Sequence, residues 1–382
     1  MGSHVGQIVH LTTVHPSYDI RIFHKEAKTL ARAGYEVTLI AQHDGDRVVE
    51  GVRVIGLPKP RNRLARIFGL AWRAFRSALR ERADVYHFHD PELLPVGVLL
   101  KLWTRAKVIY DVHEDVPQQI LTKHWIPAPL RRPLAVLFNA FEKLLAQALD
   151  AVVVATEGIA EKFAQLNPIV VHNYPDLKML PNLSSPIREM NEKVLVYIGG
   201  ISELRGAREM VRALEHLSPV WDIRLDLIGK FEPPELEQEL RGLPGYQRVR
   251  FLGWLPWGEA WQHAQSAAAG LLLFHPAPNH ERSLPNKLFE YMAAGLPVVA
   301  SNFPLWKEII EGNNCGLCVD PLDPREIAQA IEYLLAHPDE ARRMGKNGQQ
   351  VVLEKYNWGK EARTLLNLYV RILGRRDIRS SS

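Results

Sequence analysis

The chain has 382 residues, enough for two domains, because globular domains usually hold about 100–200 residues each. Its 47% hydrophobic and 24% charged residues exclude a disordered protein, and its two cysteines exclude a disulfide-stapled scaffold and favour a reducing compartment. The sequence has neither an uncharged apolar run of about eighteen residues nor a signal-peptide pattern, so we expect a cytoplasmic protein.

Strand and helix patterns alternate through the first 172 residues. The predicted strands are 7–13, 37–42, 52–57, 85–89, 107–113, 151–155 and 169–172. The predicted helices include 20–33, 64–82, 134–148 and 157–165. Such alternation is typical of a parallel sheet with helices on both faces. We therefore predict a doubly wound α/β domain, similar to a Rossmann domain, over residues 1–172.

The alternation pauses at 173–192, where Pro, Asn and Ser indicate a hinge linker. It then resumes with strands at 194–199, 223–228, 249–252, 270–274, 297–300 and 316–319. Helices are predicted at 206–217, 234–242, 258–267, 286–294, 304–311, 324–336 and 339–355. We predict a second Rossmann-like domain over 193–356, facing the first across a cleft. A last helix, 357–375, is expected to cross back to the first domain.

The first strand-to-helix loop argues against two common enzyme classes. Its sequence, TTVHPSYDIRIF, lacks the G-x-G-x-x-G turn of dinucleotide-binding enzymes, and the chain has no G-x-x-x-x-G-K-[ST] phosphate loop. A dehydrogenase or a P-loop enzyme is therefore not expected.

Two later segments carry the features of an anion site. Gly199 and Gly200 open a loop that leads into a helix, and Arg205 adds a forked cation suited to phosphate. In the second segment, Pro285 fits the first turn of a helix, and Lys287 and Glu290 share one face of it. Each pattern also fits an ordinary structure, a tight turn in the first case and an exposed Lys–Glu pair in the second.

These segments carry a family resemblance. YIGGISELRG and LPNKLFEYMAAGLPVVAS resemble the family-4 retaining glycosyltransferases of the GT-B fold. HPSYDIRIFHKEAKTLARAGYEV, YDVHEDVP and VHNYPD resemble a bacterial branch of that family that makes polysaccharides and glycolipids. The resemblance covers roughly residues 5–373.

The resemblance implies a nucleotide-sugar on the second domain, with a basic pair at its diphosphate and a glutamate at its ribose. Arg205 matches one basic position and Glu290 matches the glutamate. The other basic position is usually an arginine where this chain has Gly200, and we expect Lys287 to compensate. The full set of predicted donor-binding residues is Gly199, Gly200, Arg205, Gly229, Lys230, Glu281, Arg282, Pro285, Asn286, Lys287, Leu288 and Glu290.

One position near the donor sugar departs from the family. Relatives commonly have a glutamate eight positions before the ribose glutamate, and this chain has Arg282 there, with Glu281 next to it. Either the neighbouring carboxylate takes over or recognition of the donor sugar is altered. The sequence therefore leaves the sugar open.

The first domain is expected to hold the acceptor. His113 ends the strand KVIYDVH, at the sheet edge where ligands bind, and the resemblance places it beside the transferred sugar. Asp19 and Arg21 lie in the first loop, where we expect them to touch the acceptor or the phosphates. His87 and His89 share a face of VYHFHD, and His89 is assigned to the acceptor side or to a structural role. We count His113, Arg205 and Lys287 as the catalytic residues.

No metal and no cofactor are expected. Asp44-Gly45-Asp46 imitates the D-x-D of metal-dependent sugar transferases, but Asp-Gly is also a frequent turn dipeptide. Cys315 and Cys318 form a lone C-x-x-C inside a predicted strand, so we expect reduced thiols there rather than a redox pair.

Segment 59–82 holds eight basic residues and one acid, Glu81. At helical spacing its apolar residues share one face: Leu64, Ile67, Phe68, Ala71, Trp72, Phe75, Ala78 and Leu79. The opposite face carries arginines, which suits either solvent or an anionic membrane surface. A second stretch, 123–138, mixes Trp, Pro and Arg in a similar way. We favour peripheral membrane association, on the inner face of the cell membrane, and expect no nucleic-acid binding, since no base-stacking module is present.

The overall prediction is a retaining hexosyltransferase that moves a sugar from a nucleoside-diphosphate-sugar to a hydroxyl of a saccharide or lipid-linked acceptor. Two alternatives remain open, a sugar-nucleotide epimerase of the same fold and a partner that binds nucleotide-sugar without catalysis.

Overall fold

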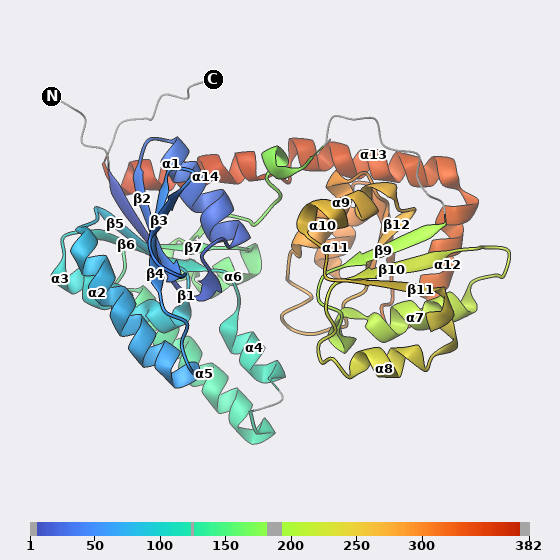
Figure 1. Ribbon diagram of the computed structural model, residues 1–382, viewed down its shortest axis with the longest axis horizontal. Helices are drawn as coiled ribbons and strands as arrows, with labels where there is room; N and C mark the ends of the chain where they lie inside the picture. Colours follow the sequence, from blue (N-terminus) through green and yellow to red (C-terminus); the bar gives the residue numbers. More distant parts are fainter. Residues whose placement is uncertain (1–5, 124–125, 182–192, 375–382) are drawn as a thin grey trace. The chain divides into compact units, whose positions relative to one another are not determined.

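The computed structural model describes residues 6–123, 126–181 and 193–374 (Figure 1). The chain forms two compact units. The first unit consists of Met1–Asn173 and Trp358–Ser382, and the second unit is Tyr174–Asn357. Residues 182–192, the second half of the predicted hinge linker, lie outside the described residues.

The first unit is built on an eight-stranded sheet in the order β3-β4-β2-β1-β5-β6-β7-β8. All neighbours are parallel except β3 and β4. The strands are β1 (Gln7–Pro16), β2 (Glu36–Gln42), β3 (Arg47–Val49), β4 (Val52–Leu57), β5 (Val85–Phe88), β6 (Lys107–Val112), β7 (Ala151–Val154) and β8 (Ile169–Val170). The antiparallel strand β3 was not predicted, because its three residues are too short to show a period.

Helices cover both faces of this sheet. They are η1 (Ile20–Ala27), α1 (Lys28–Arg32), η2 (Ala65–Leu70), α2 (Ala71–Glu81), η3 (Pro91–Leu93), α3 (Leu94–Trp103), α4 (Val116–Thr122), α5 (Ala128–Ala146), α6 (Glu157–Lys162), η4 (Ala164–Leu166) and α14 (Trp358–Ile372). Core residues of α2, α3, α5 and α6 pack on one face of the sheet, and those of η1, α1 and α14 pack on the other. The last helix of the chain therefore completes the core of the first unit.

The helix predicted over 20–33 begins as a π-helix. The Asp19 carboxylate accepts the backbone N–H groups of Arg21 at 2.8 Å and Ile22 at 2.9 Å, which satisfies two donors at the start of η1. Its buried residues then include charged side chains beside the apolar ones, Arg21 and Glu26 among them. The π-helix η1 therefore places these charged side chains in the interior of the first unit.

The basic segment 59–82 differs from its prediction. The sequence predicts one buried apolar face, but the first turns are the π-helix η2, in which each hydrogen bond spans one more residue than in an α-helix. That change of period rotates the apolar positions relative to the α-helical part. Three members of the predicted face are buried and Leu79 is half-buried, while four are exposed: Leu64, Ile67, Phe68 and Trp72.

The second unit has a six-stranded parallel sheet in the order β11-β10-β9-β12-β13-β14. In chain order this is 3-2-1-4-5-6, the order of dinucleotide-binding Rossmann domains. The strands are β9 (Val194–Ile198), β10 (Arg224–Ile228), β11 (Val249–Gly253), β12 (Ala269–Leu272), β13 (Val298–Ser301) and β14 (Gly316–Val319).

Two apolar cores lie on the two faces of the second sheet, one against α7, α8 and α12 and the other against α9, α10 and α11. The helices of this unit are η5 (Leu177–Met179), η6 (Glu203–Arg205), α7 (Ala207–His216), α8 (Leu236–Arg241), η7 (Pro244–Arg248), α9 (Trp257–Ser266), α10 (Asn286–Ala293), α11 (Pro304–Ile310), α12 (Pro324–Ala336) and α13 (Pro338–Glu354). Among the described residues of both units, no helix is both long and apolar enough to cross a bilayer.

Candidate active site

Each sheet has a point where the connections diverge to opposite faces. In the second unit it lies between neighbouring strands β9 and β12, because α7 packs on one face and α10 on the other. In the first unit it lies between β1 and β5, which lead to η1 and α3 on opposite faces. Ligands of open parallel sheets bind at the carboxyl edge at such points. Most of the predicted site residues follow these strands.

In the second unit, two glycines allow close approach of two loops. Gly199 has φ +131° and Gly229 has φ +151°, a region that side chains avoid. A Cβ at Gly229 would overlap the carbonyl of Gly199, and a Cβ at Gly199 would lie 2.7 Å from Nζ of Lys287. The backbone after β9 is therefore packed against the loop after β10 and against the Lys287 amine.

The guanidinium of Arg205 folds back over this loop. Its Nη1 donates to the carbonyl of Gly200 at 3.2 Å, and its centre lies 5.9 Å from the ring of Phe274. A Cβ at Gly200 would overlap Nη1 of Arg205. The resemblance predicts a basic residue in place of Gly200, and in this chain Arg205 fills the space that a side chain there would need.

Lys287 lies in the first turn of α10, which begins after the cap residue Pro285. Its Nζ donates to the hydroxyl of Tyr197 at 3.0 Å and lies 4.1 Å from the centre of that ring. Burial and the nearby Arg205 charge hold the pKa of Lys287 well below its ordinary value, with Glu290 acting in the opposite direction. Two basic side chains and the first amides of a helix thus converge at one place, an arrangement suited to a diphosphate.

The other predicted donor residues are distributed unevenly. Leu288 is buried in the core, and Pro285, Asn286 and Glu290 are partly buried along α10. Lys230, Glu281 and Arg282 are exposed. The structure therefore brings together Gly199, Gly200, Arg205, Gly229 and Lys287, with Glu290 close enough to act on the Lys287 charge. It leaves the side chains of the three other residues exposed to solvent.

Tyr197 and Phe274 also belong to the site, although the sequence patterns did not predict them. The Tyr197 hydroxyl donates to the Gly200 carbonyl at 2.6 Å, and Nζ of Lys287 lies 5.4 Å from the centre of the Phe274 ring. Both aromatics belong to apolar strand runs and are typical of core positions in sequence. Their place directly before the two loops of the switch point was the available signal.

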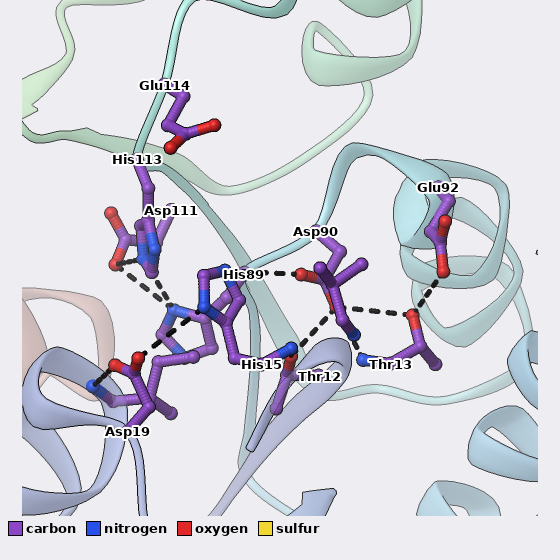
Figure 2. A network of polar contacts seen from close by, with 12 residues as sticks. Thr12, Thr13, His15, Asp19, His89, Asp90, Glu92, Asp111, His113 and Glu114 are labelled. Atoms are coloured by element: carbon purple, nitrogen blue, oxygen red, sulfur yellow. Dashed lines mark hydrogen bonds and ion pairs between the residues drawn. The ribbon is translucent and has the colours of Figure 1, made fainter. Parts of the chain in front are cut away.

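In the first unit, His113 is held by a carboxylate from its own strand. Its Nε2 lies 2.9 Å from Oδ2 of Asp111, and the His113 side chain is 12% exposed (Figure 2). The same Asp111 oxygen accepts from Nδ1 of His89 at 3.2 Å. Asp111 therefore holds both imidazole rings. Asp111 was not predicted as a site residue, because it lies within the strand run KVIYDVH.

Arg21 pairs with Asp111, and its burial contradicts the expectation that it touches the acceptor or the phosphates. It is 3% exposed, forms an ion pair with Glu26 at 2.9 Å and donates to the carbonyl of Val171 at 2.7 Å. The Arg21 and His113 charges outweigh burial and hold the pKa of Asp111 well below its ordinary value. A guanidinium so enclosed cannot touch an acceptor or a phosphate, so Arg21 has a structural role.

Of the two roles expected for His89, burial excludes the acceptor side and leaves the structural role, because His89 is 2% exposed. Its Nε2 lies 2.9 Å from Nδ1 of His10, and burial lowers the pKa of His89 to about 4, so the ring is neutral. His87 contacts the hydroxyl of Tyr369 on α14 at 2.8 Å. These histidines form a buried layer beneath His113 rather than an acceptor surface.

Asp19 remains near the edge of the site. Besides capping η1, it lies 3.5 Å from Nδ1 of His15, and the His15 ring lies 5.2 Å from the His113 ring. Burial lowers the pKa of His15, but Asp19 and Asp90 outweigh it and hold that pKa above its ordinary value. Asp90 in turn accepts from the Thr12 hydroxyl at 2.9 Å, which joins the ends of β1 and β5 (Figure 2).

Two groups of buried ligand atoms could be considered for a metal ion. They are His10, Glu26, His87 and His89, and Glu26, His89, Asp111 and His113, with atoms within 4.8 Å of one another in each group. Arg21 already pairs with both carboxylates of these groups, and three of the imidazoles are linked by hydrogen bonds. These carboxylates and imidazoles therefore form a hydrogen-bonded network around the guanidinium of Arg21.

The two sequence motifs that imitate other chemistries have ordinary structures. Asp44-Gly45-Asp46 lies in the exposed connection before β3, where Asp46 accepts from the N–H of Gly56 at 3.0 Å. Cys315 is buried and Cys318 is half-buried, and burial raises the pKa of each thiol to about 12. Thiols with such pKa values are poor nucleophiles and poor ligands at neutral pH.

Comparison with protein families gives two matches that follow the two units. Residues 21–173 match the family described as "Glycosyl transferase 4-like domain", and residues 192–337 match "Glycosyl transferases group 1". Together they cover more than half of the chain.

Similar proteins and structures agree with these matches. An MMP alpha-(1->4)-mannosyltransferase of Mycolicibacterium hassiacum is 24% identical over 84% of this chain and 77% of the relative. A glycogen synthase of Mycobacterium tuberculosis is 22% identical over 92% and 90%. Sucrose-phosphate synthase from Thermosynechococcus elongatus has a similar fold, with a TM-score of 0.77 and 19% identity over 97% of this chain and 99% of that one.

A further similar structure is that of Anabaena HepE in complex with UDP and glucose. Its TM-score is 0.70, with 16% identity over 96% of this chain and all of that one. At these identities the solved structures establish the fold, and the family matches establish the enzyme class. The chain is therefore a glycosyltransferase that belongs to the family-4 glycosyltransferases of the GT-B fold.

Proposed function

We propose that the enzyme moves a sugar from a nucleoside-diphosphate-sugar to a hydroxyl of a saccharide or lipid-linked acceptor, with retention of anomeric configuration, in cell-surface polysaccharide or glycolipid synthesis. The observation that carries the donor assignment is the convergence of Arg205 and Lys287 on the loop Gly199–Gly200. The Anabaena structures with UDP and glucose and with UDP-glucose support a nucleotide-sugar donor for a protein of this fold.

The chemistry of the leaving group follows from these two cations. Breaking the bond to the sugar leaves negative charge on a diphosphate, and fixed donors aimed at developing charge lower the barrier most. Arg205 offers a forked guanidinium and Lys287 an ammonium at the start of α10. We propose that they stabilise the diphosphate without a metal ion or cofactor.

The acceptor is assigned to the first unit, on the side of Asp19, with His113 beside the transferred sugar. This imidazole is fixed by Asp111 yet partly exposed, so it can hydrogen-bond to a sugar hydroxyl. For retention we propose attack from the face of the leaving group, with the departing phosphate oxygen taking the acceptor's proton. A lipid-linked acceptor lies in a membrane, so the proposal includes peripheral association through residues 59–82.

The test is a panel of UDP-, GDP- and ADP-sugars incubated with the full chain and candidate acceptors. Release of nucleoside diphosphate is measured together with the anomeric configuration of the product by NMR. An α-linked product from an α-linked donor is expected, and a β-linked product would refute retention. Epimerised donor without acceptor would favour the epimerase alternative, and donor binding without turnover under any acceptor would favour a non-catalytic partner.

A further inference from the structure

The outer side of α5 carries an apolar stripe that the first unit leaves uncovered. Leu130, Leu134, Leu137, Phe141 and Leu144 follow at alternating spacings of four and three residues, which places them on one side of a helix. Each of these side chains is between 41% and 68% exposed. The buried residues of α5 are Ala135, Glu142 and Ala146, so the stripe is a second face, separate from the one packed on the sheet.

A second stripe lies on η2 and α2. Leu64, Phe68 and Trp72 are spaced four residues apart and are 67%, 71% and 52% exposed. The ring of the buried Phe75 lies 5.3 Å from Trp72 and 5.5 Å from Trp103, so these two exposed rings of α2 and α3 pack on the same residue. Because α2 packs on α3 and α3 on α5, and all three cover the same side of the sheet, the two stripes belong to one outer surface. Figure 1 shows α2 and α5 on that side of the first unit.

The charge on this surface is mostly positive. Residues 61–82, 94–105 and 128–146 hold twelve Lys and Arg and two Glu. Two of these cations pair with carboxylates outside the three ranges, Arg66 with Glu92 and Lys101 with Asp150. Glu81 pairs with Arg53, and Glu142 is buried, where it accepts from Tyr110 at 2.8 Å and pairs with Lys162. Neither carboxylate neutralises the outer surface, so a second copy of the same face would be repelled and an anionic partner attracted.

We propose that this face, formed by η2–α2, α3 and α5, docks on an anionic lipid bilayer with its two apolar stripes in the acyl boundary and its arginines among the headgroups. Large exposed aliphatic and aromatic side chains flanked by basic residues are the features of helices that lie in a membrane interface. Nucleic acid would use the charge but leave the leucine stripe in water. The bilayer accounts for both the charge and the apolar area.

The docking face lies on the same side of the first unit as the assigned acceptor position. In a parallel α/β domain each crossover helix begins at the carboxyl edge of the sheet, and His89 and His113 follow β5 and β6 at that edge. The exposed N-terminal ends of η2 and α5 therefore lie toward the edge of the sheet where the acceptor is assigned. The link between docking and the acceptor rests on the lipid-linked acceptor proposed above, whereas docking itself needs neither donor nor acceptor.

The test is flotation of the full chain with vesicles of phosphatidylcholine alone and of phosphatidylcholine with phosphatidylglycerol. We expect at least tenfold stronger partitioning to the anionic vesicles, weakened but not abolished at high salt, and a blue shift of tryptophan fluorescence. Phe68→Ser and Leu137→Ser should each lower partitioning about tenfold, because each withdraws a large apolar side chain. Leu322→Ser, at an exposed leucine of the second unit, is the matched control and should change nothing.

Two outcomes would overturn docking: equal partitioning to both vesicle types, or a dimer by light scattering that both serine variants dissociate. Unchanged thermal unfolding of the variants shows that they fold, as expected for exposed positions. Donor turnover on a water-soluble acceptor is measured in parallel and should be unaffected by them. Vesicle binding without turnover would contradict the proposed sugar transfer alone. Turnover without vesicle binding would contradict membrane docking, including the peripheral association proposed above, and would leave the proposed sugar transfer standing.

Discussion

The guanidinium of Arg21 donates two hydrogen bonds to the carboxylate of Asp111, from Nε at 3.1 Å and from Nη2 at 2.9 Å. Asp111 in turn holds His113, so a residue in the first turn of η1 determines the position of a ring at the end of the sixth strand. The pair is buried, and each charge there depends on the other.

Arg21→Met should lower the free energy of unfolding of the first unit by about 3–5 kcal/mol, because it leaves Asp111 and Glu26 buried without their cation. Urea unfolding followed by circular dichroism would measure this. Arg32→Met, at an exposed arginine of the same unit, is the control. A loss no larger than that of the control would contradict a structural role for Arg21.

Arg205→Met should lower kcat/KM by about 100–1000-fold, since it removes a fixed donor at the proposed diphosphate. The measurement is the initial rate of nucleoside diphosphate release at several donor concentrations. Arg212→Met, at an exposed position of α7, should keep the parent rate. If both variants behaved alike, Arg205 would not belong to the donor site.

Gly200→Ala should weaken donor binding by about tenfold or more, because the new Cβ would overlap Nη1 of Arg205 and displace the guanidinium. Isothermal titration calorimetry with the nucleoside diphosphate gives the affinity. Gly258→Ala is the matched control, since a Cβ there meets nothing within 4 Å. Unchanged affinity in Gly200→Ala would mean that the position of Arg205 does not matter for binding.

Binding of a nucleoside diphosphate should take up protons at Lys287. Burial and Arg205 hold the pKa of Lys287 well below 10.5 in the empty site, and the anion will raise it. Calorimetry at several pH values below 10.5, in buffers of different ionisation enthalpy, should show proton uptake, because part of Lys287 is neutral in the empty site and charged in the complex. Lys287→Met should abolish the uptake and weaken binding. Binding without uptake at any of these pH values in the parent enzyme would contradict the prediction.

His172 should make the first unit pH-sensitive. It lies 3.0 Å from Glu157 and 3.3 Å from Glu361 on α14; these carboxylates outweigh burial and raise its pKa to about 9. Because the pKa is raised on folding, the stabilisation is fully present below about pH 6.5 and is lost as the pH rises through about 9. His172→Gln should cost about 1–3 kcal/mol of the free energy of unfolding at pH 6 and nothing above pH 10.

Unfolding of the His172→Gln variant and the parent at pH 6, 8 and 10 would measure this difference. His216→Gln, at an exposed histidine of α7, is the control. A difference that is constant with pH would show that the imidazolium is not the source.

Much of the architecture could be read from residue patterns. The strand runs before Gly199 and before His113 have the continuous apolar character of buried parallel strands, and the structure has strands β9 and β6 there. The short strand β3 was not predicted. In the π-helices η1 and η2, residues that would share one face at a period of 3.6 residues are rotated relative to one another.

Most helices and strands, the fold class and the family follow from residue patterns alone, because periodicity and local motifs are properties of neighbouring residues. The sequence also singled out Arg205 and Lys287, since their chemistry is visible beside glycines and at a helix start. Three features become visible only in the folded chain: the burial of Arg21 and His89, the contact of Tyr197 with Lys287, and the two apolar stripes that remain outside the core. Burial and pairing depend on residues far apart in the chain, here ninety positions from Arg21 to Asp111, and no local pattern encodes them.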